Sequence, residues 1–142
     1  MTISHLFYIA IIMAFAAYGA YTEPSGAELI IDGFNCERTV TIIEVLDGDT
    51  VKTDAYERIR FTGINTPELG EPGSLEAKNF TEQMILGKTV CIDVDDTRPL
   101  DKYDRTLAVI LVGGANLNKQ LLDQKLARIM YIKPSEFNPY NW

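Results

Sequence analysis

Short segments rich in β-branched or alternating apolar residues follow one another after residue 37, and such segments predict β-strands. They cover residues 38–46, 50–53, 56–64, 88–95 and 105–112. Asp47 and Gly48 separate the first two segments, and this pair is typical of a tight turn between neighbouring strands. The pattern therefore predicts five short strands.

Two other segments repeat their apolar residues every three or four positions, as an amphipathic helix does. The first begins at Ser74, a residue that favours a helix start, and runs to about Leu86, directly before Gly87. The second runs from Leu117 to about Ala127. Both are predicted to pack one face against the strands.

The order of these elements is three strands, a helix, two strands and a helix. This order predicts a mainly β fold with helices (α+β), namely a five-stranded β-barrel of the OB type. Residues 132–142 contain Pro134 and Pro139 and show little helical pattern, which leaves a third helix open. We therefore expect two to three helices.

The chain begins with a hydrophobic leader, because residues 6–20 form an unbroken run of apolar and small residues. The run is shorter than the roughly 20 residues of a typical membrane span and has the length of a signal-peptide core. We divide the chain into residues 1–27, a signal peptide or membrane anchor, 28–37, a linker, and 38–142, the folded domain. Cleavage of the leader stays open; in both cases the domain is expected outside the cytoplasm, secreted or anchored.

The only two cysteines, Cys36 and Cys91, lie on either side of the first three predicted strands. An even number of cysteines in an exported domain suggests a disulfide. The alternative is a pair of free, partly buried thiols.

The chemistry open to the domain is limited by its single histidine, His5, which lies in the leader. Ser-His-Asp hydrolysis and histidine-ligated zinc are therefore excluded for the folded part. The net charge of −7 argues against a protein that coats nucleic acid. It does not exclude an enzyme that binds one phosphate locally through arginines and a metal.

Three polar clusters stand at predicted strand ends or in loops, where binding residues usually lie. They are residues 47–50, Arg60 with residues 65–68, and residues 101–105. Each cluster alone could be an ordinary turn. Arg60, however, lies within a predicted strand, where a buried charge needs a partner. Carboxylates, an amide and two arginines without histidine match the needs of metal-assisted phosphodiester hydrolysis.

Five motifs between residues 40 and 133 occur in one order: VLDGDTV, IRFTGINTPE, EAKNFTEQM, DKYDRTLA and LNKQLLDQKLA. In their residues and spacing, the chain resembles the staphylococcal-nuclease-like (thermonuclease) domain family. The resemblance implies a five-stranded OB barrel, which agrees with the elements predicted from the hydrophobic pattern.

The resemblance also implies a calcium site. Its ligands would be Asp49, Asn65 and the backbone carbonyl of Thr66, with Asp47 as an auxiliary residue beside them. Asn65 stands where the family has a second aspartate, so the site has one negative charge fewer, and a different divalent metal is an open alternative. A second departure is Lys125, which stands where the family has a glycine.

The remaining site residues are implied in the same way. Arg60, Glu68 and Arg105 correspond to the catalytic residues, and Lys102, Tyr103 and Tyr131 to residues near the substrate. The expected activity is calcium-dependent endonuclease hydrolysis of DNA and/or RNA that leaves 3′-phosphate ends. Single strands are the expected substrate, a monomer the expected state, and an uncleaved leader the only expected membrane contact. The alternative is a non-catalytic OB-fold module that binds nucleic acid or protein.

Overall fold

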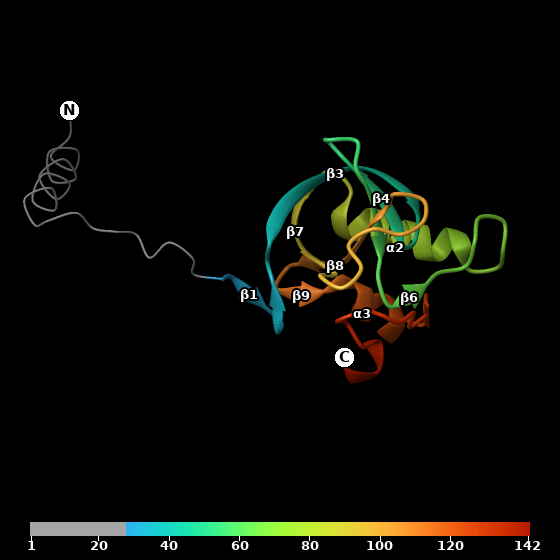
Figure 1. Cartoon of the computed structure of the whole chain (residues 1–142). Coiled ribbons are helices and arrows are strands. Elements are labelled where there is room, and N and C mark those ends of the chain that lie inside the picture. Colours follow the sequence, from blue (N-terminus) through green and yellow to red (C-terminus); the bar gives the residue numbers. More distant parts are fainter. Residues whose placement is uncertain (1–27) are drawn as a thin grey trace, which may run out of the picture.

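Five strands wrap around one core and close into a barrel in the computed structural model, which describes residues 28–142 (Figure 1). The strands are β3 (Arg38–Asp47), β4 (Thr50–Thr53), β5 (Arg58–Phe61), β7 (Thr89–Val94) and β8 (Thr106–Val112). Neighbours pair antiparallel in the order β5-β4-β3-β7-β8, and a parallel pairing of β5 with β8 closes the barrel. The predicted mainly β, five-stranded OB barrel is confirmed. The predicted leader, residues 1–27, lies outside the described residues.

The long strand β3 belongs to both sides of the barrel. Its first residues pair with β7 and its later residues with β4, and the register against β4 shifts twice. Such bulges bend a strand and increase its twist, which lets a short sheet curve onto itself. Inside, the side chains of Ile42, Ile59, Phe61, Ile92 and Ile110 are fully buried. Burial of their apolar surface is the main force that holds the barrel together.

Two α-helices lie in the described part of the chain, α2 (Ser74–Ile85) against β3 and α3 (Leu117–Asp123) against β8. Among residues 28–142, no helix is long and apolar enough to cross a membrane. The third helix that the sequence left open is not an α-helix in the described part of the chain, where residues 132–142 form only a short 3₁₀ turn, η1 (Pro139–Asn141).

The helix ends differ in detail from the prediction. Ser74 is the first helical residue rather than the cap, because Gly73 takes the cap position with a φ of 87° and no side-chain hydrogen bond. The second helix stops at Asp123 rather than near Ala127. The cause is Lys125, whose φ of 58° turns the chain into the left-handed conformation usual for glycine after a helix.

The predicted strand 56–64 is split into two. β5 ends at Phe61, and β6 (Ile64–Asn65) pairs instead with β10 (Arg128–Ile129). Gly63 makes the break, since its φ of 79° is outside the strand region. It also leaves room for Trp142, because a Cβ on Gly63 would lie 2.8 Å from the indole ring. The break carries Ile64 and Asn65 to a separate ladder beside the barrel.

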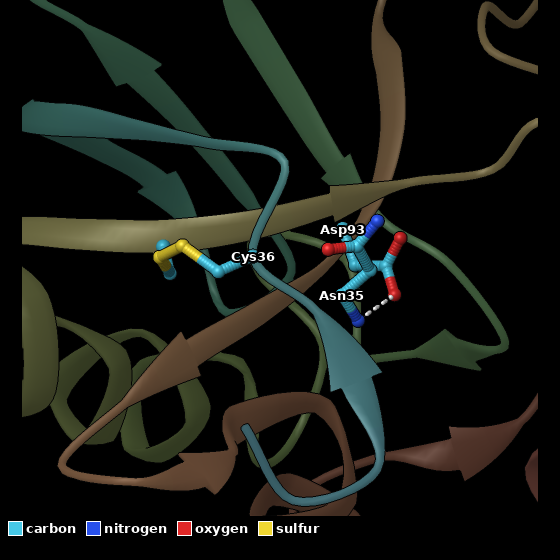
Figure 2. Close-up of a disulfide and its surroundings, with 4 residues drawn as sticks. Asn35, Cys36 and Asp93 are labelled. Atoms are coloured by element: carbon cyan, nitrogen blue, oxygen red, sulfur yellow. Dashed lines mark hydrogen bonds between the residues drawn. A yellow bond between two sulfur atoms is a disulfide. The ribbon is translucent and has the colours of Figure 1, made fainter. Parts of the chain in front are cut away.

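The segment 28–37, predicted as a linker, is instead part of the folded unit. It forms a two-stranded hairpin of β1 (Ile30–Ile31) and β2 (Phe34–Asn35). Cys36 and Cys91 are joined by a disulfide, with their Cα atoms 5.4 Å apart (Figure 2). Phe34 adds aromatic contacts with Phe137 and Trp142. The disulfide is the one that the even cysteine count suggested, whereas the aromatic contacts join residues far apart in the sequence, so the local composition of the segment does not predict them.

Candidate active site

A cavity of about 440 Å³ gathers almost all the predicted site residues. It lies between the β3–β4 turn, the end of β5 and the loops around residues 98–105 and 130–135. The predicted residues on its wall are Asp47, Asp49, Arg60, Asn65, Glu68, Lys102, Tyr103, Arg105 and Tyr131. Thr66 is the exception, because its side chain is buried beneath the β3–β4 turn.

The β3–β4 turn holds Asp47 and Asp49 by close packing on α2. A Cβ on Gly48 would lie 2.7 Å from the Cβ of Ala77 and 2.8 Å from the Cγ2 of Thr66. The hydroxyl of Thr81 donates a 2.7 Å hydrogen bond to the Gly48 carbonyl. Only glycine fits this approach, so the Asp-Gly-Asp sequence is required by packing as well as by the turn.

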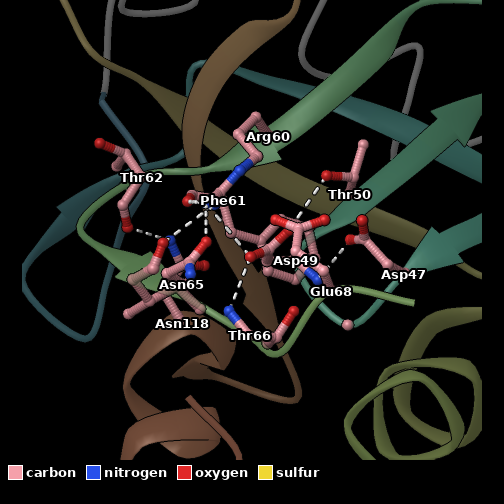
Figure 3. Close-up of polar contacts among 12 residues, drawn as sticks. Asp47, Asp49, Thr50, Arg60, Phe61, Thr62, Asn65, Thr66, Glu68 and Asn118 are labelled. Atoms are coloured by element: carbon pink, nitrogen blue, oxygen red, sulfur yellow. Dashed lines mark hydrogen bonds and ion pairs between the residues drawn. The ribbon is translucent and has the colours of Figure 1, made fainter. Parts of the chain in front are cut away.

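Asp49 is a buried carboxylate with several partners (Figure 3). It accepts hydrogen bonds from the backbone N–H of Thr66 at 2.8 Å and from the Thr50 hydroxyl at 3.1 Å. The guanidinium of Arg60 lies 3.2 Å away, and both side chains are less than a tenth exposed. A buried charge is costly unless it is paired and hydrogen-bonded, and Asp49 is both.

Arg60 is held in place by nearly all its donors. Its Nη1 donates to the carbonyls of Phe61 at 2.6 Å and Ile64 at 3.0 Å. Its Nη2 donates to Asn65 Oδ1 at 3.0 Å and faces Asp49. Burial lowers the pKa of Arg60, and the Asp49 charge opposes that shift. A guanidinium has five N–H groups, so only the Nε–H is without a partner among the described residues.

Asn118 on α3 fixes the end of β5. The sequence alone predicts no role for this residue. Its fully buried amide donates to the carbonyls of Thr62 at 2.9 Å and Ala108 at 3.1 Å and accepts from the N–H of Ile110. These bonds tie β5 to β8 at the point where the chain leaves Arg60. The available signal was its spacing, because Asn118 lies three and four residues before Leu121 and Leu122 and so shares their helix face.

Arg105 is oriented by a carboxylate that sequence reasoning placed in a cluster without a role. Its Nε donates to Asp101 Oδ2 at 2.7 Å, while Asp101 Oδ1 accepts from the N–H groups of Tyr103 and Arg105. Burial alone would raise the pKa of Asp101, but these donors hold the pKa below its ordinary value. Because only Nε has a partner within residues 28–142, both terminal amines of Arg105 stay available to a ligand. The guanidinium also lies 5.2 Å from the centre of the Tyr103 ring.

The donor set on the other wall suits a hard cation, since it consists of carboxylate, amide and carbonyl oxygens. Burial, followed by the hydrogen bond and charge of Asp49, raises the pKa of Asp47 to about 6. A cation beside these two carboxylates would offset their repulsion. Within residues 28–142, however, no three acidic, histidine or cysteine side chains gather closely enough to hold an ion by themselves. Asn65 and a backbone carbonyl would therefore have to contribute.

Residues outside the five motifs also contribute to the wall. Arg98, Met130 and Ile132 face the cavity. The loop that bears Arg98 is shaped by Asp95, a fully buried carboxylate that accepts from the N–H groups of Thr97 and Glu136. Loop positions of this kind depend on tertiary contacts, so no local pattern predicts them.

Comparison with known proteins agrees with this geometry. The sequence model of the family described as staphylococcal nuclease homologue matches residues 58–141. The chain belongs to this family. The match confirms the resemblance drawn from the five motifs. It includes Arg60, Asn65, Glu68 and Arg105, whereas Asp47 and Asp49 precede it.

Relatives named thermonuclease or endonuclease are similar to about two thirds of this chain. Identity is 32% over 108 residues with a thermonuclease of Staphylococcus hyicus, covering 70% of this chain and 63% of the relative. It is 35% over 101 residues with a thermonuclease of Staphylococcus intermedius, covering 65% and 60%. It is 28% over 102 residues with Endonuclease YncB of Bacillus subtilis, covering 66% and 48%. The chain thus spans less than two thirds of the length of these relatives.

Proposed function

We propose that this chain is a metal-dependent nuclease that hydrolyses phosphodiester bonds of DNA and/or RNA. The observation that carries the proposal is a single cavity that joins two arginines, Arg60 and Arg105, to the carboxylates of Asp49 and Glu68. The names thermonuclease and endonuclease of its relatives support the same reaction. The arginines fit a phosphate, and the carboxylates fit a cation and a water molecule.

The two arginines have different parts in this proposal. Arg105 keeps both terminal amines available for two phosphate oxygens, because Asp101 takes only its Nε–H. Arg60 is buried and bound to two carbonyls, so it presents a fixed charge with little freedom. Fixed donors that need no rearrangement stabilise charge that develops on the phosphate in the transition state. Lysine lacks the planar fork, so it is a poor replacement at either position.

Glu68 is the proposed general base. It lies on the cavity wall, on the loop between β6 and α2, and its carboxylate has no ion-pair partner within residues 28–142. In the proposal its carboxylate takes a proton from the water that attacks phosphorus opposite the leaving oxygen. Release of the 5′ oxygen leaves a 3′-phosphate end.

The proposed metal is calcium, held by Asp49, Asn65 and the Thr66 carbonyl, where it would neutralise charge on a phosphate oxygen. Asn65 supplies an oxygen but no charge, so affinity is expected to be modest and other divalent ions are candidates. Single strands are the proposed substrates, because unpaired bases can stack on aromatic side chains such as the exposed ring of Tyr103.

The proposed setting is outside the cytoplasm, either secreted or held by an uncleaved leader. The apolar run of residues 6–20 supports this setting. The Cys36–Cys91 disulfide agrees with it, since such bonds persist in oxidising compartments. A monomer completes the proposal, because one chain supplies every residue named for the cavity.

The deciding experiment is a cleavage assay on single-stranded DNA with the purified chain, in millimolar calcium and in excess chelator. We expect calcium-dependent cleavage and products whose 3′ ends are substrates for a phosphatase. The Glu68→Gln variant, which keeps the shape of the side chain, should retain DNA binding and lose roughly 10²–10⁴-fold in kcat. It also serves as the control for a contaminating nuclease. A folded protein that cleaves nothing with calcium, magnesium or manganese would leave the non-catalytic binding module as the function.

A further inference from the structure

A second groove, of about 290 Å³, adjoins the candidate active site at Asn65. Its walls are the loop that follows β6, with Pro67, Glu71 and Pro72, and the segment 125–128 that leads into β10. Asn65 lines both cavities. The two cavities therefore meet at Asn65.

The pairing of β6 with β10 places a cation at this junction. Arg128 is the register partner of Asn65 in the antiparallel ladder. Side chains of directly paired residues stand on the same face of a sheet, a few ångströms apart. Asn65 in turn accepts a hydrogen bond from Arg60 at 3.0 Å. Asn65 thus lies between Arg128 and Arg60, the arginine proposed to bind the scissile phosphate.

Both cations of the groove, Lys125 and Arg128, lack an ion pair within residues 28–142. Most other basic side chains there are engaged with acids or aromatic rings, as Lys52, Lys78 and Lys119 show with their glutamate or aspartate partners. The one acid on the groove wall, Glu71, already accepts the backbone N–H of Glu68. Two positive charges in one groove, neither with an ion pair within residues 28–142, are notable in a chain of net charge −7 and favour an anionic ligand.

The backbone at Lys125 adds an independent observation. Its φ of 58° is a left-handed conformation that glycine adopts without strain and a lysine does not. The reversal there needs no side chain, because it is made by backbone bonds from Leu126 and Ala127 to the Leu121 carbonyl. A strained backbone conformation beside a functional cavity is explained when the side chain of that residue has a function in the cavity.

We propose that this groove is a second phosphate subsite. In it Lys125 and Arg128 bind the backbone phosphate of the nucleotide next to the one cleaved. The proposal rests on the proposed nuclease function and extends it. It makes the substrate a polynucleotide segment that crosses Asn65 rather than a lone phosphodiester.

The test compares two pairs of charge-removing substitutions with the same change in net charge. One variant carries Lys125→Gln with Arg128→Gln, and the control carries Lys78→Gln with Lys88→Gln, two lysines on or just after α2, outside both cavities. Binding is measured by fluorescence anisotropy on a labelled single-stranded DNA of about 12 bases, in the Glu68→Gln background so that no cleavage interferes. Turnover is measured with Glu68 intact on the same DNA and on a dinucleotide that has one phosphodiester.

We expect the groove variant to bind the longer DNA roughly tenfold more weakly and its salt slope to fall by about 0.7, the value for one lost phosphate contact to a single strand. The kcat/KM on the dinucleotide should stay unchanged, and the control pair should change neither quantity by more than about twofold. Lys125→Gly should weaken binding as Lys125→Gln does while raising the Tm, which separates lost charge from a damaged fold.

The subsite would be overturned if the groove variant and the control variant lost the same binding affinity for the longer DNA. It would also be overturned if the groove variant lost as much kcat/KM on the dinucleotide as on the longer DNA. Groove-dependent binding without any cleavage would support the subsite and refute the nuclease. Cleavage of DNA by the wild type, with binding that is unchanged when Lys125 and Arg128 are replaced, would support the nuclease and refute the subsite. A chain that neither binds nor cleaves single strands would overturn both.

Discussion

Two aspartates in this barrel are buried to nearly the same extent but in opposite electrostatic settings. Asp49 is 4% exposed and Asp93 is 6% exposed. Asp49 faces the Arg60 guanidinium and accepts bonds from Thr50 and Thr66. Asp93 lies beside the N-terminal hairpin, where its carboxylate accepts a 2.8 Å hydrogen bond from the backbone N–H of Asn35 and no other from residues 28–142 (Figure 2).

The surroundings explain why only one of these sites suits charge chemistry. Burial, together with the charges of Glu136, Glu37 and Asp96, raises the pKa of Asp93 to about 6, although the Asn35 N–H opposes the shift. No cation pairs with Asp93 within residues 28–142. The hairpin region is held by a disulfide and aromatic contacts, whereas the cavity around Asp49 is held by charge. Removal of one charged side chain should therefore destabilise the protein at the cavity, where Asp49 and Arg60 are paired, and stabilise it at Asp93, which has no cation partner within residues 28–142.

The largest effect is expected at the ion pair of the cavity. Arg60→Gln leaves Asp49 buried without a cation and deprives the carbonyls of Phe61 and Ile64 of donors. Loss of one partner of a buried pair costs about 3–5 kcal/mol. Urea unfolding should show this loss. Arg105→Gln is the matched control, and because the Arg105–Asp101 pair is more exposed, its cost should be about 1 kcal/mol or less. Equal losses in the two variants would contradict the distinction.

The next largest loss of stability is expected when the disulfide of the hairpin region is removed. The Cys36–Cys91 bond encloses a loop of 55 residues, and a disulfide that closes a loop of this length stabilises by about 4 kcal/mol in the chain-entropy model. A Cys36→Ser/Cys91→Ser variant should lose about 2–4 kcal/mol of unfolding free energy. Its kcat should be retained at temperatures where it is folded, because the hairpin shares no residue with the active-site cavity. A large fall in kcat of the folded variant would show that the two regions are coupled.

The barrel could be predicted because its signals are local. Alternating apolar residues, the Asp47-Gly48 turn and the helical spacing between the third and fourth strands give the element order, and the order implies the closure. The break at Gly63 and the hairpin at residues 30–35 could not be predicted in this way. Both depend on contacts with distant residues, Trp142 in the first case and Cys91 in the second.

The candidate site likewise has features that the sequence predicted and features that depend on contacts between distant residues. The motifs indicated which charged side chains share a cavity, and the structure brings Asp49, Arg60, Glu68 and Arg105 into one cavity. Their chemical roles stay predictions. The sequence alone did not show that Arg60 donates hydrogen bonds to backbone carbonyls, or that Asn118 fixes the end of β5. Hydrogen bonds of this kind follow from the assembled backbone, which no local pattern encodes.

The smallest effect should appear at Asp93 and depend on pH. The folded pKa of Asp93, about 6, lies above the ordinary value of 3.8, so the native state binds its proton more tightly than the unfolded chain. The stability from this proton is present below about pH 4 and is lost as the pH rises to about 6. Asp93→Asn resembles the protonated acid and keeps an oxygen for the Asn35 N–H. The variant should match the wild type at pH 4 and exceed its Tm by roughly 3–6 °C at pH 7.5, a gain of about 1 kcal/mol. Scanning calorimetry at both pH values decides this. A gain that is the same at both would mean that packing, and not the unpaired charge, limits the stability of this region.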